Sequence, residues 1–155
     1  MHSDSDIPQA NPYLQKAIYD LLGALFSAPD PFQASLHAER LFRRICAIVQ
    51  SSFTDPEIGP FEIASEAGIS LRYLQKMFAA RGMTCGQYIQ SLRLQYAMRL
   101  LRRRAFLKAG QPVSEIAYAS GFRDYRYFAR AFRSRFGYPP VRAGAQDKDD
   151  RSEHI

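Results

Sequence analysis

The chain has 155 residues, of which 46% are hydrophobic and 23% charged, and its formal net charge is +6 at pH 7. No apolar run reaches the roughly 18 residues that a membrane span needs, which argues against an integral membrane protein. The cysteines, Cys46 and Cys85, and the three histidines are too scattered for a CxxC motif or a metal site. The N-terminal residues have neither a basic start nor an apolar run. We therefore predict no signal peptide and a cytoplasmic location.

Positive charge is concentrated in one part of the chain. Residues 1–60 hold four basic and seven acidic side chains, whereas residues 61–144 hold fifteen basic and four acidic ones. The tail from residue 145 is acidic again, with two basic and four acidic side chains. A basic segment with acidic flanks predicts a polyanionic partner, with nucleic acid first. Charge alone leaves a solvated basic surface as the alternative.

The first predicted elements are two amphipathic helices. Asn11-Pro12 predicts a helix start, and the helix over residues 13–26 has one apolar stripe, formed by Leu14, Ile18, Leu21, Leu22 and Leu25. A proline-rich break at residues 28–31 precedes the second helix, predicted over residues 34–53. One side of this second helix is apolar: Leu41, Ile45, Ile48, Val49 and Phe53.

A long helix is predicted over residues 85–104, with Thr84 and Gln87 as a capping box. Its apolar side would consist of Ile89, Leu92, Ala97, Leu100 and Leu101. After a basic loop, Gln111-Pro112 predicts a cap followed by proline in the first turn of a further helix. No segment alternates apolar and polar residues as a strand does, so the predicted fold is all-α.

A repeated unit flanks this long helix on both sides. EIASEAGISLRYLQKMF occupies residues 62–78, and EIAYASGFRDYRYFARAF occupies residues 115–132. Each unit reads as a short helix, a turn at Gly68 or Gly121, and a second helix capped by Ser70 or Asp124. This order is typical of a helix-turn-helix motif.

The second helix of each unit has an apolar and a polar face. In the first unit the inward side chains are Leu71, Leu74, Met77 and Phe78, and the outward ones are Arg72, Gln75, Lys76 and Ala79. In the second unit the inward side chains are Phe128, Ala131, Phe132 and Phe136, and the outward ones are Tyr125, Arg126, Ala129, Arg130 and Arg133. A recognition helix reads a few base pairs in one major groove, and the next groove segment on the same face lies about 34 Å away. Two units on one spacer helix therefore predict binding to double-stranded DNA.

Three segments in this order, IASEAGISLRYLQKMF, YIQSLRLQYAMRLL and VSEIAYASGFRDYRYFARAFRSRFGYPP, resemble the DNA-binding domain of AraC/XylS-type bacterial transcription regulators. The resemblance covers about residues 36–142. It implies a seven-helix, all-α domain with two helix-turn-helix subdomains whose recognition helices enter successive major-groove segments of promoter DNA. The expected organisation is an N-terminal tail and helix at 1–33, the DNA-binding domain at 34–142 and a disordered polar tail at 143–155.

Carried over by position, the resemblance implies base-facing side chains on both recognition helices: Arg72, Gln75, Lys76, Tyr125, Arg126 and Arg130. Arginine can bond guanine O6 and N7, and glutamine can bond adenine N6 and N7. The capped helix start at Ser70 presents backbone N–H groups to phosphate, and Arg133 is expected to contact phosphate or solvent. Tyr73 and Tyr127 are expected to pack, and Ala129 stands where a polar base contact can occur.

The predicted function is a sequence-specific transcription regulator, an activator by family analogy, with promoter DNA as its partner and RNA polymerase as a further one. An architectural DNA binder and a helical protein-interaction module with a basic face stay as alternatives. No catalytic constellation or phosphate loop is present, so neither an enzyme nor a cofactor is expected. Family members usually carry a sensory or dimerisation domain. This chain is expected to have no room for one beyond a remnant at residues 1–33, so no effector ligand is expected to bind it. The stripe at residues 13–26 predicts either homodimerisation or docking onto the domain.

Overall fold

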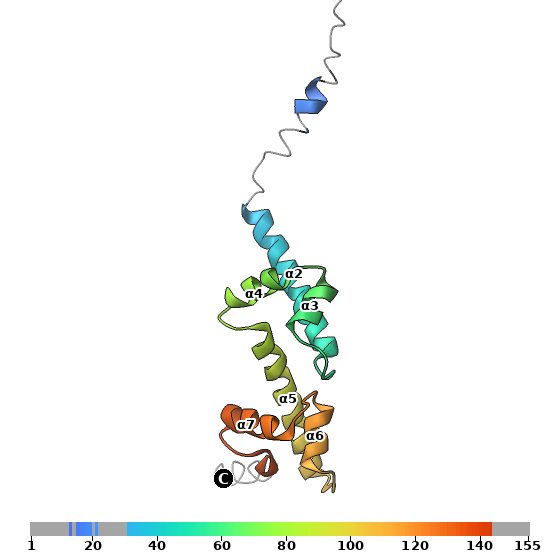
Figure 1. The fold of residues 1–155 in the computed structure, drawn as a ribbon, viewed down its shortest axis with the longest axis vertical. Helices are drawn as coiled ribbons and strands as arrows, with labels where there is room; N and C mark the ends of the chain where they lie inside the picture. Colours follow the sequence, from blue (N-terminus) through green and yellow to red (C-terminus); the bar gives the residue numbers. More distant parts are fainter. Residues whose placement is uncertain (1–12, 14, 20, 22–30, 144–155) are drawn as a thin grey trace, which may run out of the picture. The chain divides into compact units, whose positions relative to one another are not determined.

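The computed structural model describes residues 13, 15–19, 21 and 31–143, and every regular element in these residues is helical (Figure 1). Residues 13, 15–19 and 21 are helical, as the helix predicted over 13–26 requires; the rest of that prediction lies outside the described residues. The chain divides into two units, residues 1–39 and 40–155, and the division falls within α2. The helices are α2 (Pro31–Ser52), α3 (Pro60–Ala67), α4 (Leu71–Ala79), α5 (Cys85–Phe106), α6 (Val113–Ala119), α7 (Tyr125–Phe136) and the 3-10 helix η1 (Pro140–Arg142).

The all-α prediction is confirmed, and the helix boundaries differ from the predicted ones by a few residues. Helix α2 begins at Pro31 instead of residue 34, because proline is favourable in a first helical turn. Helix α5 continues to Phe106, two residues beyond the predicted end. The predicted cap at Gln111 is wrong by one position. Pro112 is the N-cap, its backbone is extended, and no side chain caps α6.

Two separate hydrophobic cores lie along α5. The first core contains Ile45, Val49, Ile63, Leu74, Phe78, Cys85 and Ile89, and the second contains Leu94, Ala97, Met98, Leu101, Ile116, Phe128 and Phe132. Cys85 and Leu94 are nine residues apart, and at about 100° per residue they point to opposite sides of the helix. The single apolar side predicted for this helix is therefore wrong: α5 buries one face in each subdomain.

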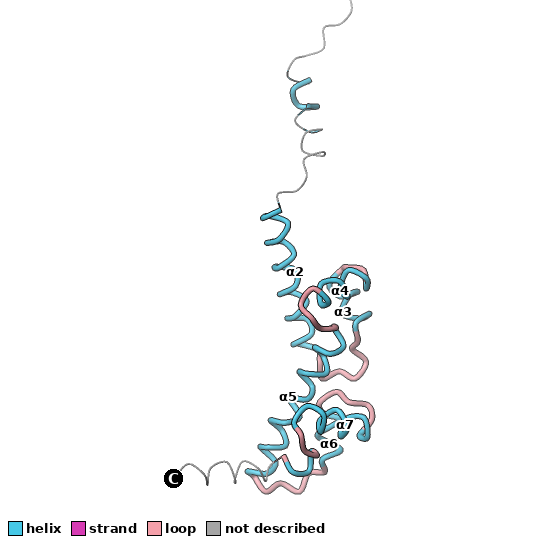
Figure 2. The backbone as a smooth tube through the Cα atoms, turned by 90° about the vertical axis from the view of Figure 1, so that its left-hand side faces the viewer, coloured by secondary structure: helices cyan, strands magenta, loops and turns pink. Residues whose placement is uncertain are grey.

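Each helix-turn-helix unit packs on its own core and on its own half of α5. Helix α3 packs against α4, and α6 packs against both α5 and α7. Figures 1 and 2 show α4 and α7 on the same side of α5, displaced from each other along it. A helix of 22 residues is about 33 Å long, which is comparable with one turn of B-DNA.

Local sequence determines most of these helix ends. Thr84 Oγ1 accepts from the Gln87 N–H at 3.1 Å, and Gln87 Oε1 accepts from the Thr84 N–H at 2.8 Å. The predicted capping box is thus confirmed. Gly68 ends α3 in the left-handed region with a φ of 71°, as predicted for the first turn. The same local rule explains Gly137 after α7, where φ is 84°.

Candidate nucleic-acid interface

The first recognition helix, α4, has the two faces that the sequence predicts. Leu74, Met77 and Phe78 are buried in the first core, and Phe78 stacks edge-on against Phe42 with ring centroids 5.2 Å apart. Arg72, Gln75 and Lys76 are exposed on the opposite face. The arrangement holds three polar, hydrogen-bonding side chains on a helix whose other face is fixed by packing.

The second recognition helix, α7, is anchored by aromatic side chains. Phe128 and Phe132 are fully buried, with ring centroids 5.5 Å apart. Three arginines are exposed on the outer face: Arg126, Arg130 and Arg133.

Tyr125, at the first position of α7, differs from the outward placement that the sequence suggests. Its side chain is half-buried against the second core, with its ring 6.1 Å from that of Phe128. Because the ring packs on the core, the part of Tyr125 that remains available to DNA is smaller than that of the neighbouring Arg126. Ala129 is also half-buried.

Both recognition helices start at a capped residue. Ser70 Oγ accepts a hydrogen bond from the Tyr73 N–H at 3.1 Å, and Asp124 Oδ1 accepts one from the Tyr127 N–H at 2.6 Å. The capping role expected for Asp124 is confirmed. Ser70 has the same role, so what it offers a phosphate is the backbone at the helix start rather than a free hydroxyl.

We expect Ser70→Ala and Asp124→Ala each to lower the free energy of unfolding by about 0.5–2 kcal/mol, because each leaves a helix N–H without its partner. Urea denaturation measures the change. Asp124→Asn is the matched control, because asparagine caps as well as aspartate and should retain most of the stability. Equal losses for Asp124→Asn and Asp124→Ala would show that the negative charge, and not the cap, provides the stabilisation.

The two tyrosines after the caps lie in different surroundings. Tyr127 packs beside Phe122, with ring centroids 6.2 Å apart, and its hydroxyl accepts a hydrogen bond from Gln90 Nε2 at 2.7 Å. Packing was the expected role for this residue. Tyr127 nevertheless stays 48% exposed, and Tyr73 on α4 is 40% exposed, so the expected packing is only partial for both tyrosines.

A polar groove lies between α5, α7 and the loop before α5, and sequence patterns gave no sign of it. Its volume is about 570 Å³, and its polar lining includes Gln87, Gln90, Gln95, Ser134 and Arg135. These residues come from two helices that are distant in the sequence, so no spacing rule would group them. The groove adds uncharged donors and one guanidinium group beside the exposed face of α7.

Two features of the described residues bear on metal binding and thiol chemistry: the placement of the side chains that a metal site needs, and the environment of Cys85. Within them, no three His, Cys, Asp or Glu side chains gather closely enough to hold a metal ion. Burial, and to a smaller extent Cys46, raises the pKa of the Cys85 thiol to about 11, so it stays protonated at neutral pH. No helix in the described part of the chain is long and apolar enough to cross a membrane.

Comparison with known proteins gives consistent matches. A family model described as a helix-turn-helix domain matches residues 63–144. The transcriptional activator NphR of Rhodococcus sp is 35% identical over 107 residues, which are 69% of this chain and 30% of that protein. The transcriptional activator RhrA of Rhizobium meliloti is 34% identical over 94 residues, 59% of this chain and 28% of that protein. The chain thus spans about a third of the length of these curated relatives.

Solved structures agree on the fold. The C-terminal domain of AraT, a response regulator from Geobacillus stearothermophilus, superposes with a TM-score of 0.61 at 23% identity. The match covers 68% of this chain and 84% of that one. The helix-turn-helix model covers more than half of the chain, and the two recognition helices lie within it. The protein therefore belongs to the AraC-type family of helix-turn-helix DNA-binding transcription regulators.

Proposed function

We propose that the chain binds promoter DNA sequence-specifically, with α4 and α7 in successive major-groove segments on one face of the duplex. The observation that carries the proposal is the placement of both recognition helices on the same side of α5 (Figures 1 and 2). Each of these helices also has an exposed polar face. Because α5 is about 33 Å long, a single chain can present two recognition helices to DNA without forming a symmetric dimer.

The side chains of the proposed interface divide into base contacts and phosphate contacts. Arg72 and Arg126 sit at the second position of their helices, where a recognition helix approaches base edges, and either can form the two-bond contact to guanine. Gln75 can pair with adenine, while Lys76 and Arg130 can contact either bases or phosphates. The remaining members of the proposed interface are phosphate contacts: the helix start at Ser70, the Tyr125 hydroxyl and Arg133.

Selection of bound duplexes from a random pool tests this function. We expect a motif of two short parts whose centres lie about one helical turn, or 10–10.5 base pairs, apart. Similar affinity for random and selected duplexes would replace the proposal with an architectural DNA binder. Failure to shift any duplex at low salt would favour a module that binds an acidic protein.

We further propose that the chain activates transcription in the cytoplasm, through contact with RNA polymerase. The relatives NphR and RhrA are described as transcriptional activators, which supports this direction of regulation. A reporter promoter carrying the selected motif should give more transcript when the chain is present. Less transcript would make the protein a repressor that blocks polymerase.

Self-association through residues 13–26 is a separate proposal. Ile18 is 53% exposed and Leu21 is 68% exposed, so apolar surface of this helix is available to a second copy. Sedimentation should show a dimer for the native chain and a monomer for Ile18→Asp or Leu21→Asp. A monomer in every case would leave the alternative, in which this segment covers another part of the same chain.

A further inference from the structure

A polar contact joins the two helix-turn-helix subdomains beside α5. On one side lies the loop of residues 53–59, whose Phe53 and Ile58 pack on the first core. Arg93 of α5 reaches the backbone of this loop: its Nε donates to the Phe53 carbonyl at 2.6 Å. Its Nη2 donates to the carbonyls of Asp55, at 2.8 Å, and Ile58, at 3.3 Å. One half-buried arginine thus holds three carbonyls of the loop against the middle of α5.

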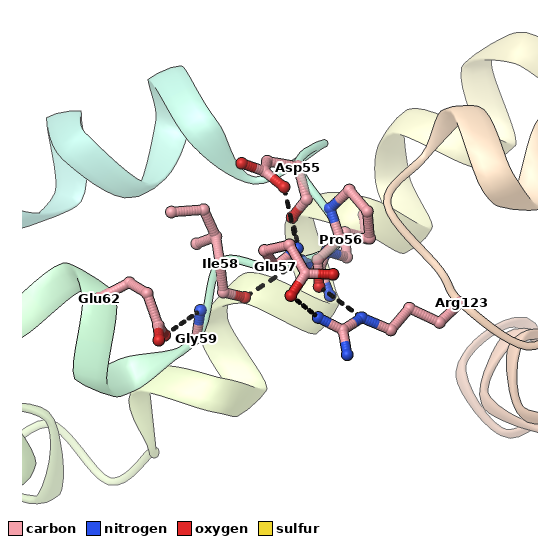
Figure 3. A network of polar contacts seen from close by, with 8 residues as sticks. Asp55, Pro56, Glu57, Ile58, Gly59, Glu62 and Arg123 are labelled. Carbon is pink, nitrogen blue, oxygen red and sulfur yellow. Dashed lines mark hydrogen bonds and ion pairs between the residues drawn. The ribbon is translucent and has the colours of Figure 1, made fainter.

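The second subdomain reaches the same loop from the other side. Arg123, two residues before α7, donates through Nε to the Pro56 carbonyl at 3.0 Å, and its Nη2 pairs with Glu57 Oε2 at 2.6 Å (Figure 3). Burial lowers the pKa of Arg93, and the nearby charge of Arg123 lowers it further. Two like-charged groups therefore meet at one short loop, and Glu57 with the loop carbonyls compensates their repulsion.

Gly121 brings the two backbones into close approach at this contact. Its φ is 87°, and a Cβ atom there would lie 2.7 Å from the Phe53 carbonyl oxygen and 2.8 Å from Arg93 Nε. Any side chain at this position would push the turn before α7 away from the loop. We refer to Arg93, Gly121, Arg123 and residues 53–59 as the latch.

We propose that the latch sets the distance and angle between α4 and α7, and therefore the half-site spacing that the protein accepts on DNA. This inference rests on the proposed function. The latch connects the start of α7 to α4 through few residues. Arg123 lies next to the Asp124 cap of α7, and the loop leads directly into α3, which packs against α4. The latch therefore adds a second connection between the two subdomains, beside the one that α5 itself provides.

The proposal separates positioning from base reading. None of the base-facing side chains assigned above belongs to the latch, so loosening the latch should leave each recognition helix able to bind its own half-site. Adding or removing one base pair between half-sites changes their separation by about 3.4 Å and their relative rotation by about 35°. A rigid pair of recognition helices discriminates against such a change, whereas a loosened pair tolerates it.

The test compares the native chain with Arg123→Glu and with the charge exchange Arg123→Glu/Glu57→Arg. Each is titrated against duplexes with the selected spacing, with one base pair more or fewer, and with one half-site.

Arg123→Glu should reduce discrimination between spacings about fivefold, the factor expected from one hydrogen bond and one exposed ion pair. Affinity for a single half-site should stay within about twofold. The charge exchange should restore part of the discrimination. Arg103→Glu is the matched control; it reverses an exposed charge of α5 outside the latch and should leave the spacing profile unchanged.

A distance measurement without DNA keeps the latch distinguishable from the proposed function. Spin labels at Ala80→Cys and Ser134→Cys, in a Cys46→Ser/Cys85→Ala background, report the separation of the ends of α4 and α7. The labelled protein with Arg123 intact should give one narrow distance distribution. Arg123→Glu in the same background should broaden that distribution. Broadening in a protein that binds no duplex would support the latch and overturn the DNA-binding function. An unchanged distribution and spacing profile in folded Arg123→Glu would overturn the latch.

Discussion

Arg72→Ala and Arg126→Ala should each weaken binding to the selected duplex by about 1–3 kcal/mol, which is roughly 5- to 150-fold in affinity. Both side chains are exposed at the second position of a capped recognition helix. Alanine removes a guanidinium fork that bonds two acceptors of one guanine, and the preference at that base pair should be lost with it. Competition against duplexes substituted at each position measures both effects.

Arg72→Lys and Arg126→Lys are the matched controls, because lysine keeps the charge but loses the planar fork. A base-reading arginine should be replaced poorly by lysine, whereas a phosphate contact should be replaced well. Uniform loss on every sequence, together with a salt slope reduced by about one, would assign the residue to the backbone instead. The two residues lie in different subdomains, so the double variant should show nearly additive losses.

Features determined by a few neighbouring residues were predictable from the sequence. The caps at Ser70 and Asp124, the box of Thr84 with Gln87 and the turn at Gly68 each depend on contacts within four residues. The inward faces of α4 and α7 follow from helical periodicity in the same way. The fold class was also predictable, because the same helix-turn-helix pattern occurs twice, once on each side of the long helix.

Features determined by distant segments were not predictable. Helix α5 changes its buried face between Ile89 and Leu94, so its apolar residues form no single stripe for periodicity to detect. The latch depends on backbone carbonyls of residues 53–58. Every residue has a backbone carbonyl, so the sequence does not indicate which of them accept hydrogen bonds. Gly121 was expected as a turn glycine, which it is, but its close approach to Phe53 emerges only from the tertiary fold.

Phe132→Ala should lower the free energy of unfolding by about 3–5 kcal/mol, a large share of the 5–15 kcal/mol typical of a whole domain. Its ring is fully buried, and its centroid lies 5.5 Å from that of Phe128 and 4.6 Å from that of Phe136. The cavity left by alanine opens in the middle of a chain of aromatic rings that cannot close around it. Chemical denaturation measures the loss.

Phe106→Ala is the matched control, because that ring is 86% exposed and its removal should change the stability by no more than about 0.5 kcal/mol. The second core lies on its own face of α5, so the damage should be greatest in the subdomain that carries α7. Binding to the half-site read by α7 should therefore fail at a lower temperature than binding to the half-site read by α4. Loss of both at one temperature would show that the two cores unfold as one cooperative unit, with α5 and the latch transmitting the damage between them.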